Sequence, residues 1–319
     1  MTGRAPGGGP DRAATGGATG EPAAAGATHL FLLGADYHLG DLLWLTAVLA
    51  EYRRRVRPAR LAVGCPDRPI SRILEHNPLL DDLRYGDPAR LRAAARTRFG
   101  RDVVVRDLRP APLGLAMLRD WRHHRPWRYY RDLWFEPRGQ WLATFLHLGR
   151  LSAYRPVLGL CAADRATAAA LPAPYVVLAP HIGRYRLPLA SRAWRRVKGW
   201  DETNWVRLAS LLRTAGYEPV TAAAADQAPI PGTRPLLGLP IRQVAGVIAG
   251  AAGLVGGESG LWFIAAARAT PFVIVPWWLP RGVDWAAPMG VPHRLVARRD
   301  ATVDAVFAAC RELMSHDRR

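Results

Sequence analysis

Short apolar runs rich in β-branched residues alternate along the chain with longer segments in which apolar residues recur every three or four positions. The first pattern predicts β-strands and the second predicts helices with one buried face. The expected strands are residues 29–33, 60–63, 83–85, 102–106, 175–179, 217–221, 236–239, 253–255, 272–275 and 294–297. The expected helices are residues 41–55, 69–75, 88–98, a segment from 163, 202–214, 241–249, 261–267 and 303–314. This alternation predicts an α/β fold with parallel, doubly wound sheets, in which the runs at 102–106 and 175–179 are buried.

Length and composition predict two domains of ordinary size. The chain has 319 residues, of which 50% are hydrophobic, so a core can be buried in each domain. Residues 1–27 are rich in Gly, Ala, Thr and Pro and are expected to form a disordered tail. We place an N-terminal Rossmann-like domain at 28–172, a C-terminal Rossmann-like domain at 173–299, and a final helix and tail at 300–319. Ala173-Pro174 is the expected linker.

A polar turn near the C-terminal end of the chain has the composition of an anion site. Residues 256–260, with the sequence GGESG, separate an expected strand from the helix at 261–267. A helix N-terminus offers backbone N–H groups and the positive end of the helix dipole. We therefore expect the turn, with the hydroxyl of Ser259, to hold the phosphates of a nucleotide. The alternative is a capping turn in which Glu258 only complements the dipole.

Two further polar residues lie at positions typical of ligand sites. Asp41 follows Gly40 where the first expected strand meets its helix, and ligands of open α/β sheets bind at the carboxyl ends of strands. Taken alone, an aspartate at a helix N-terminus is most often a cap or a partner of the dipole. Lys198 lies in a loop after the strand at 175–179, where it can neutralise a phosphate, although a single loop lysine is usually only solvated.

Composition argues against nucleic acid as the partner. The formal net charge is +18, but the 44 basic residues are 43 arginines and one lysine, a bias that a GC-rich genome produces. Helix-turn-helix, zinc-finger and RRM patterns are missing from the sequence. The three cysteines are far apart without metal-ligand spacing, which predicts reduced, partly buried thiols in a cytosolic protein.

The sequence has no segment expected to cross a membrane. Arg268 and Pro271 interrupt the apolar stretch from Leu261 before the roughly 20 residues that a membrane-spanning helix needs, and the first 27 residues lack the regions of a signal peptide. Residues 117–147 interleave aromatic with basic side chains. They form either a surface for an anionic or lipid-borne acceptor at the cytoplasmic membrane face, or a helical insertion with its aromatic side chains packed inward.

Three motifs in order carry a family resemblance: GDLLWLTAVL at 40–49, KGWDETNW at 198–205 and LVGGESGLWFIAAARATPFVIV at 254–275. Their order and spacing resemble glycosyltransferase family nine, the ADP-heptose:lipopolysaccharide heptosyltransferases. The family pattern is a G-D-x-x-x-x-T-P-x-L helix, a K-x-W-P-x-E-x-F segment and a G-x-D-S-G-x-x-H-x-A-A-A-x-x-T-P turn. The resemblance covers most of residues 29–276.

The resemblance implies a GT-B fold, in which two Rossmann-like doubly wound domains face each other across a cleft. It implies metal-independent, inverting sugar transfer with Asp41 as general base. Lys198 would stabilise the charge that develops on the departing diphosphate. The residues that it places at the donor are Gly257, Glu258, Ser259, Gly260, Leu261 and Trp200.

Several positions depart from the family pattern and indicate a divergent member. Phe263 stands where the family has a histidine, and Glu258 where it usually has an aspartate. Asp201 and Thr203 replace the proline and glutamate of the middle motif, and Ala47 replaces the proline of the first. The loop before Lys198 is longer than usual; the further phosphate contacts expected in this region are His181, Arg184 and Arg186.

The expected partners follow from this reaction. The donor is a nucleotide-diphosphate sugar, with an ADP-sugar and a heptose-like sugar favoured, and the acceptor is a saccharide, a glycolipid or a small molecule. We expect neither a cofactor nor a metal ion, and a cytoplasmic location with peripheral contact to the membrane if the aromatic and basic insertion binds lipid. The alternative is a catalytically inactive nucleotide-binding or scaffold protein of the same fold.

Overall fold

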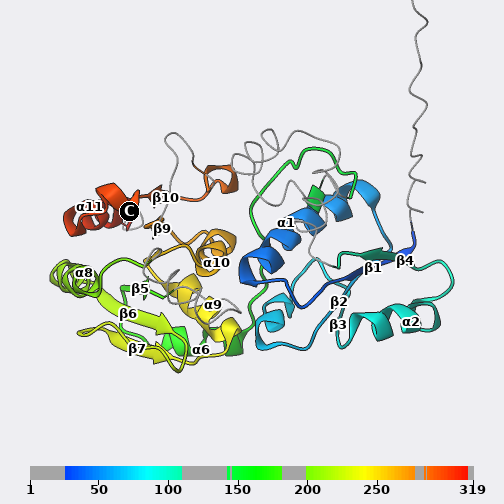
Figure 1. Ribbon diagram of the computed structural model, residues 1–319, viewed down its shortest axis with the longest axis horizontal. Coiled ribbons are helices and arrows are strands. Elements are labelled where there is room, and N and C mark those ends of the chain that lie inside the picture. Colours follow the sequence, from blue (N-terminus) through cyan, green and yellow to red (C-terminus); the bar gives the residue numbers. More distant parts are fainter. Residues whose placement is uncertain are drawn as a thin grey trace, which may run out of the picture.

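Two parallel β-sheets, one in each half of the sequence, form the frame of the protein (Figure 1). The computed structural model describes residues 26–109, 142–143, 146–181, 199–276, 284 and 286–314. The strands are β1 (Thr28–Leu32), β2 (Arg60–Cys65), β3 (Asp82–Tyr85), β4 (Val104–Asp107), β5 (Tyr175–Ala179), β6 (Glu218–Ala223), β7 (Arg234–Leu237), β8 (Gly253–Gly256), β9 (Phe272–Ile274) and β10 (His293–Leu295). The α-helices are α1 (Leu39–Val56), α2 (Pro88–Phe99), α6 (Ala162–Ala169), α8 (Glu202–Thr214), α9 (Ile241–Gly250), α10 (Leu261–Arg268) and α11 (Val303–Met314). Short 3-10 helices are η1 (Pro69–Leu74), η2 (Ala287–Met289) and η3 (Arg298–Asp300).

The first sheet has the strand order β3-β2-β1-β4, and every pair in it is parallel. Successive residues of β1 are buried on opposite faces. Phe31 belongs to the core that includes α1, whereas Leu30 and Leu32 pack with Leu91 and Ala95 of α2. Burial on both faces explains why residues 30–32 of β1 are all apolar instead of alternating with polar residues.

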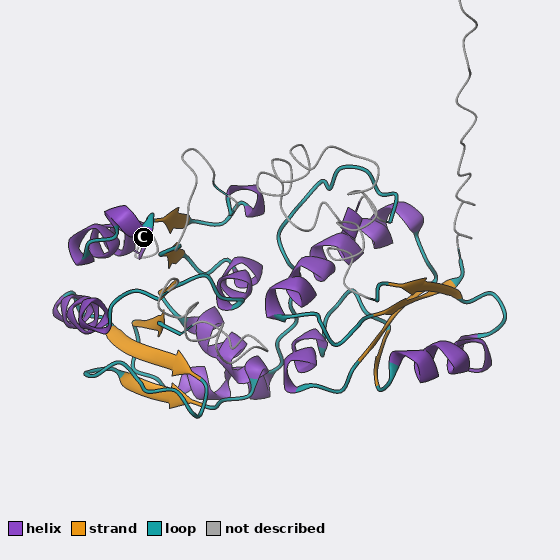
Figure 2. Ribbon diagram, viewed as in Figure 1, coloured by secondary structure: helices purple, strands orange, loops and turns teal. Residues whose placement is uncertain are grey.

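The second sheet has the order β10-β9-β8-β5-β6-β7 and is also parallel throughout. Val177 of β5 faces the core that contains α9 and α10, while Val176 and Leu178 face α8 and α11. Helices thus cover both faces of each sheet, as Figure 2 shows. The predicted α/β fold with parallel, doubly wound sheets is confirmed in this part of the chain.

Most expected elements match the observed ones, and the differences have simple causes. The expected bounds of β5, α8 and α11 are identical to those observed. The strand expected at 102–106 is not fully buried: all four residues of β4 are half-buried, because β4 is an edge strand of its sheet. The segment expected as a helix at 69–75 forms the tighter 3-10 helix η1.

Some expectations fall outside the described residues. They include residues 1–25 of the expected tail and the insertion at 117–147, apart from residues 142–143 and 146–147. In the described part, no helix is both long and apolar enough to cross a membrane. The domain boundaries stay a prediction. Helix α6 was expected at the end of the N-terminal domain and packs against α9 of the second half. Helix α11 packs against α8, β8 and β9, which also belong to the second half.

The two halves share a continuous apolar core. One cluster of buried residues includes β1, β2 and α1 from the first half and β5, α9 and α10 from the second. Helix α1 lies beside α10, and η1 lies beside α9 (Figure 1). Thr46 of α1 also binds the segment between β4 and β5, which connects the two sheets. Its buried hydroxyl accepts the N–H of Val157 in that segment at 2.9 Å and donates to the carbonyl of Leu43 at 2.6 Å.

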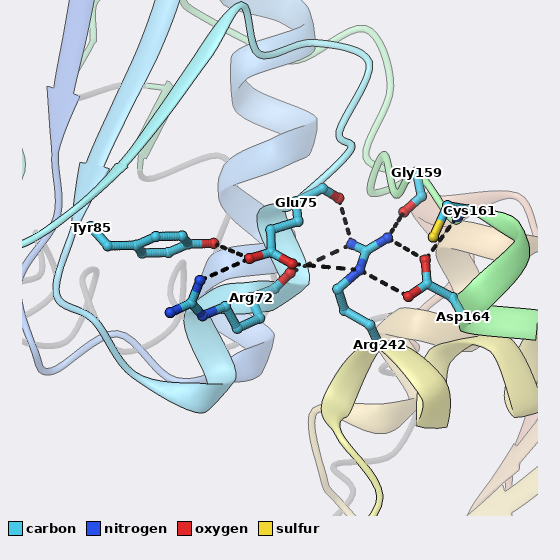
Figure 3. A network of polar contacts seen from close by, with 7 residues as sticks. All are labelled: Arg72, Glu75, Tyr85, Gly159, Cys161, Asp164 and Arg242. Carbon is cyan, nitrogen blue, oxygen red and sulfur yellow. Dashed lines mark hydrogen bonds and ion pairs between the residues drawn. The ribbon is translucent and has the colours of Figure 1, made fainter.

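A buried arginine adds polar contacts between the halves (Figure 3). Arg242 of α9 donates through Nε to Asp164 of α6 at 3.0 Å, and its guanidinium also pairs with the second carboxylate oxygen. The same group donates to the carbonyls of Glu75 at 2.5 Å and of Gly159 at 3.1 Å. Because Glu75 follows η1 of the first half, one guanidinium connects both halves and the segment between them.

Candidate functional site

The first and third predicted motifs lie at the places in the two sheets where ligands of this fold class bind. In the first sheet the strand order changes direction at β1: β2 and β3 lie on one side of it, and β4 lies on the other. In the second sheet, β5 and β8 form the corresponding switch point. Asp41 follows β1, and the turn at 256–260 follows β8. Crevices outside the carboxyl ends of strands at such points are the usual ligand sites of open α/β sheets.

Asp41 is the third residue of α1 and is partly exposed. Its carboxylate oxygen Oδ2 accepts the backbone N–H of His38, the residue before the helix, at 3.0 Å. This is the carboxylate half of a capping box, so the helix start itself fixes the orientation of Asp41. A carboxylate in this position complements the helix dipole, and it follows the carboxyl end of β1.

Carboxylates gather around Tyr37, next to Asp41. The phenol is buried and donates to the carbonyl of Leu108 at 3.1 Å. The pKa of Tyr37 is raised above its ordinary value by burial first, and then by the charges of Asp36, Asp41 and Asp107. Tyr37 therefore stays protonated and acts as a donor that connects the loops after β1 and β4.

Arginines balance part of this negative charge. Arg109 donates to both carboxylate oxygens of Asp107, at 2.8 and 2.6 Å, and these bonds lower the pKa of Asp107 below its ordinary value. Arg68 donates to the carbonyls of Ala35 and Tyr37 and so fixes the loop that leads into α1. Asp36, Arg68 and Arg109 were not predicted as site residues from the sequence. They follow β1, β2 and β4, and this position after the carboxyl end of a strand would have indicated them.

The turn at 256–260 joins the end of β8 to α10. The N–H of Gly257 donates to the carbonyl of Ala179, the last residue of β5, at 3.4 Å. Gly260 is the N-cap of α10, and the N–H of Leu261 donates to Oγ of Ser259 at 3.4 Å. The turn is thus held against the neighbouring strand, at the carboxyl ends of β5 and β8.

Asp41 and this turn are close together because the first residues of α1 contact those of α10. A methyl group placed on Gly260 would lie 2.7 Å from Cβ of Leu39, and one on Gly40 would lie 3.0 Å from Cε2 of Phe263. The two motifs are widely separated in the sequence, and the structure brings them side by side between the two sheets (Figure 1).

Phe263, at the position of the family histidine, is part of this contact. It is buried, stacks on Trp262 with 3.7 Å between ring centroids, and meets Trp44 of α1 edge to face at 5.3 Å. The side chain that the sequence identified only as a missing polar contact therefore has a packing role between the two halves.

Of the other predicted site residues, His181 and Trp200 are described. His181 follows β5 at the same edge of the sheet, where its Nε2 makes a 2.8 Å hydrogen bond with the carbonyl of Ala228. Trp200 packs edge to face on Trp205, and its indole N–H donates to the carbonyl of Ala301 at 3.0 Å. A role for Trp200 at the donor stays a prediction. Lys198, Arg184 and Arg186 lie outside the described residues.

The described residues contain no group of three His, Cys, Asp or Glu side chains arranged to hold a metal ion. Glu258 lies in the turn itself and is half-buried. The site thus consists of a carboxylate at one helix N-terminus and a hydroxyl with backbone N–H groups at another. This combination suits removal of a proton on one side and binding of an anion on the other.

Comparisons with known proteins agree with this arrangement at the level of the fold. No protein-family model matches the chain, and no curated protein matches it in sequence. Among solved structures, a glycosyl transferase family 9 protein from Veillonella parvula DSM 2008 is similar, with a TM-score of 0.65 and 13% identity over 91% of this chain and 98% of that one. The E. coli ADP-heptose LPS heptosyltransferase II has a TM-score of 0.62 and 17% identity, over 91% and 100% of the two chains. The E. coli heptosyltransferase WaaC, solved with ADP, has a TM-score of 0.55 and 16% identity, over 89% and 99%.

At these identities the likeness establishes a shared fold. It covers nearly all of this chain and nearly all of each of these proteins, so it includes both sheets and their connection. The resemblance to glycosyltransferase family nine, drawn from three short motifs, is thereby confirmed in the architecture of the chain.

Proposed function

We propose that this protein is a divergent glycosyltransferase of the heptosyltransferase type, which moves a sugar from a nucleotide-diphosphate donor to an acceptor hydroxyl. The observation that supports it best is the contact between the first turns of α1 and α10, which puts Asp41 beside the turn at 256–260. In the GT-B arrangement that we propose, the two sheets face each other across a cleft beside this contact, with the acceptor on the first half and the donor on the second.

Inverting transfer requires a base and a stabilised leaving group on opposite sides of the anomeric carbon. Asp41 takes the proton of the acceptor hydroxyl as the new glycosidic bond forms. Ser259 and the N-terminus of α10 bind the diphosphate, whose negative charge increases as the bond to the sugar breaks. Lys198 supplies the counter-charge in this proposal. The chain needs neither a metal ion nor another cofactor for these steps.

Nucleotide binding is the part of the proposal with the most support from related folds. WaaC was solved with ADP, and ADP is the nucleotide that we favour here. The acceptor is a saccharide, a glycolipid or a small molecule, and the transfer takes place in the cytoplasm or at the inner face of the membrane.

A thermal-shift screen with ADP-, GDP- and UDP-sugars, followed by mass spectrometry of the products, tests this function. A ligand that binds the native state raises the melting temperature. We expect an ADP-sugar to give the largest shift and a sugar-transfer product to form with a suitable hydroxyl acceptor. Absence of any nucleotide-dependent shift would contradict the proposal.

The base is tested by Asp41→Asn, with Asp300→Asn as the matched control at an exposed carboxylate of the second half. We expect Asp41→Asn to lower kcat by about 10²–10⁴-fold, the usual contribution of a general base, while the nucleotide-induced thermal shift stays unchanged. The control Asp300→Asn should retain both the kcat and the nucleotide-induced thermal shift of the wild-type protein. Near-normal turnover in Asp41→Asn would exclude Asp41 as the base.

One observation favours the alternative of an inactive nucleotide-binding protein. Phe263 fills the position of the family histidine with a buried aromatic ring and so removes a polar group from the edge of the turn. Under this alternative, the thermal-shift screen still detects a nucleotide, but no donor gives a transfer or hydrolysis product.

A further inference from the structure

Four residues form a reciprocal contact between the starts of α1 and α10. Leu39 of α1 packs against Gly260, and Phe263 of α10 packs against Gly40. Each helix thus presents one large side chain and one glycine, and each large side chain occupies the space above the glycine of the other helix. We call this set of four residues the α1–α10 contact.

The two glycines are needed for space and not for an unusual backbone. Gly260 has φ of −66° and ψ of −10°, which any residue adopts, and Gly40 is the second residue of a helix. An added methyl group on Gly260 would lie within 2.7–2.9 Å of three carbon atoms of Leu39. Ordinary side-chain contacts begin beyond about 3.4 Å, so the helices approach as closely as they do only because both positions lack a Cβ atom.

Phe263 is also held from its other sides. Trp262 stacks on it and Trp44 meets it edge to face, and all three rings are buried. Leu39 is buried too, with 9% of its surface exposed. Both large side chains therefore lack room to turn away, and the positions of the two helix starts depend on each other.

We propose that Leu39 and Phe263 are positioning residues. They set the distance between the base, Asp41, and the turn at 256–260, which we call the donor turn. This inference rests on the proposed glycosyl transfer. Asp41 directly follows Gly40, and Leu261, whose N–H lies at the donor turn, directly follows Gly260. A change at the α1–α10 contact therefore moves the base relative to the anomeric carbon. Displacements of about 1 Å in reacting groups can reduce rates by about 10²-fold.

Gly40→Ala is the informative single substitution. Alanine favours a helix more than glycine does, so any loss arises from the collision with Phe263 and not from the helix itself. We expect kcat to fall by about 10- to 100-fold, with little change in the affinity for the nucleotide, measured by calorimetry. Phe263→Leu, which shortens the opposing side chain, should cost less.

The double variant Gly40→Ala/Phe263→Leu tests whether the two positions act through each other. Leucine leaves room for the added methyl group, so kcat should recover above the value of Gly40→Ala alone. Phe99→Leu, at a partly buried phenylalanine of α2 on the far face of the first sheet, is the control and should not rescue Gly40→Ala.

The outcomes separate this inference from the proposed function. If the wild-type protein transfers sugar but Gly40→Ala lowers the melting temperature without lowering kcat, the α1–α10 contact is only structural and the inference is overturned. The inference is also overturned if the fold-reduction in kcat of the double variant equals the product of the fold-reductions of the two single variants. If the wild-type protein transfers no sugar from any nucleotide donor, the proposed function itself fails, and the positioning role fails with it.

Discussion

Phe263, which stands where the family pattern has a histidine, does more in the structure than leave out a polar side chain. Phe263 replaces a histidine, so the sequence indicates a lost polar contact at the donor. In the structure the ring lies between Trp44 and Trp262 and against Gly40. The residue has become part of the core between the two halves, which a comparison of motifs alone does not reveal.

Phe263→His is therefore expected to destabilise the protein instead of restoring a family feature. Burying an imidazole among aromatic rings costs about 2 kcal/mol of unfolding free energy at pH 8. The cost grows as the pH falls through about 6.5, the ordinary histidine pKa. The sign follows from burial: the charged form is disfavoured in the native state, so the unfolded chain binds more protons and stability decreases at acid pH. Urea unfolding at pH 8 and pH 5 measures both effects.

The control is Phe263→Leu, which is apolar and should lose about 1 kcal/mol independently of pH. A pH-independent loss in Phe263→His would show that the imidazole reaches solvent or a polar partner, and that the packing around this position adapts.

At the level of elements, the C-terminal half of α1 holds the segment that connects the two halves of the chain. Glu51 is buried and pairs with Arg54 and Arg55 of its own helix. Its carboxylate also accepts the hydroxyl of Ser152 at 2.5 Å, and Arg55 donates to the carbonyl of Arg150 at 2.9 Å. These bonds, led by those from Arg54, lower the pKa of Glu51 to about 2 against the opposing effect of burial.

Glu51→Gln should lose stability in a pH-dependent way. A carboxylate with a lowered native pKa contributes stability above its ordinary pKa of 4.5, and this contribution disappears as the pH falls toward about 2. We expect the variant to be less stable than wild type by up to about 3 kcal/mol at pH 7, with the difference shrinking below pH 4.5. A difference that stays constant from pH 7 to pH 3 would contradict the pairing.

The elements themselves were largely predictable, because their patterns are local. The strand β5 and the helices α8 and α11 were expected with the bounds that the structure shows, since proline, an N-cap residue or a change of periodicity marks their ends. The half-burial of β4 was not predictable. Its apolar run is the same whether a strand is central or at an edge, and strand order is a property of the whole sheet.

At the level of the whole molecule, the sequence predicted where Asp41 and the turn at 256–260 lie in their own sheets, but not that the starts of α1 and α10 touch. The positions of Asp41 and of the turn at 256–260 follow from the rule that ligands bind at the carboxyl ends of parallel strands. The contact of Leu39 with Gly260, and the bonds of Arg242 to both halves, join residues that are far apart in the chain. Such pairs depend on how the two sheets pack, and no local pattern contains that information.

Arg242 provides the test of how the two halves are held together. Its side chain and that of Asp164 are each 8% exposed, so removing one partner leaves a buried charge. Hydrogen bonds from Arg242 and from the N–H of Cys161 lower the pKa of Asp164 in spite of its burial. Arg242→Met is expected to lower the free energy of unfolding by about 3–5 kcal/mol at pH 7, because the carboxylate loses its partner.

The double variant Arg242→Met/Asp164→Asn should regain much of this loss, since no uncompensated charge remains and the amide oxygen can still accept the N–H of Cys161. The deficit of Arg242→Met should also shrink as the pH falls, because the buried, unpaired carboxyl of the variant takes up a proton first. Below the ordinary pKa of Asp164, the wild-type ion pair loses its contribution as well. Arg234→Met is the matched control: its ion pair with Glu218, at 3.7 Å, is half exposed and should be worth less than about 1 kcal/mol. Urea unfolding followed by circular dichroism measures all three variants. If Arg242→Met loses no more than this control, the apolar contacts of α1 with α10 and of η1 with α9 hold the two halves together without the buried arginine.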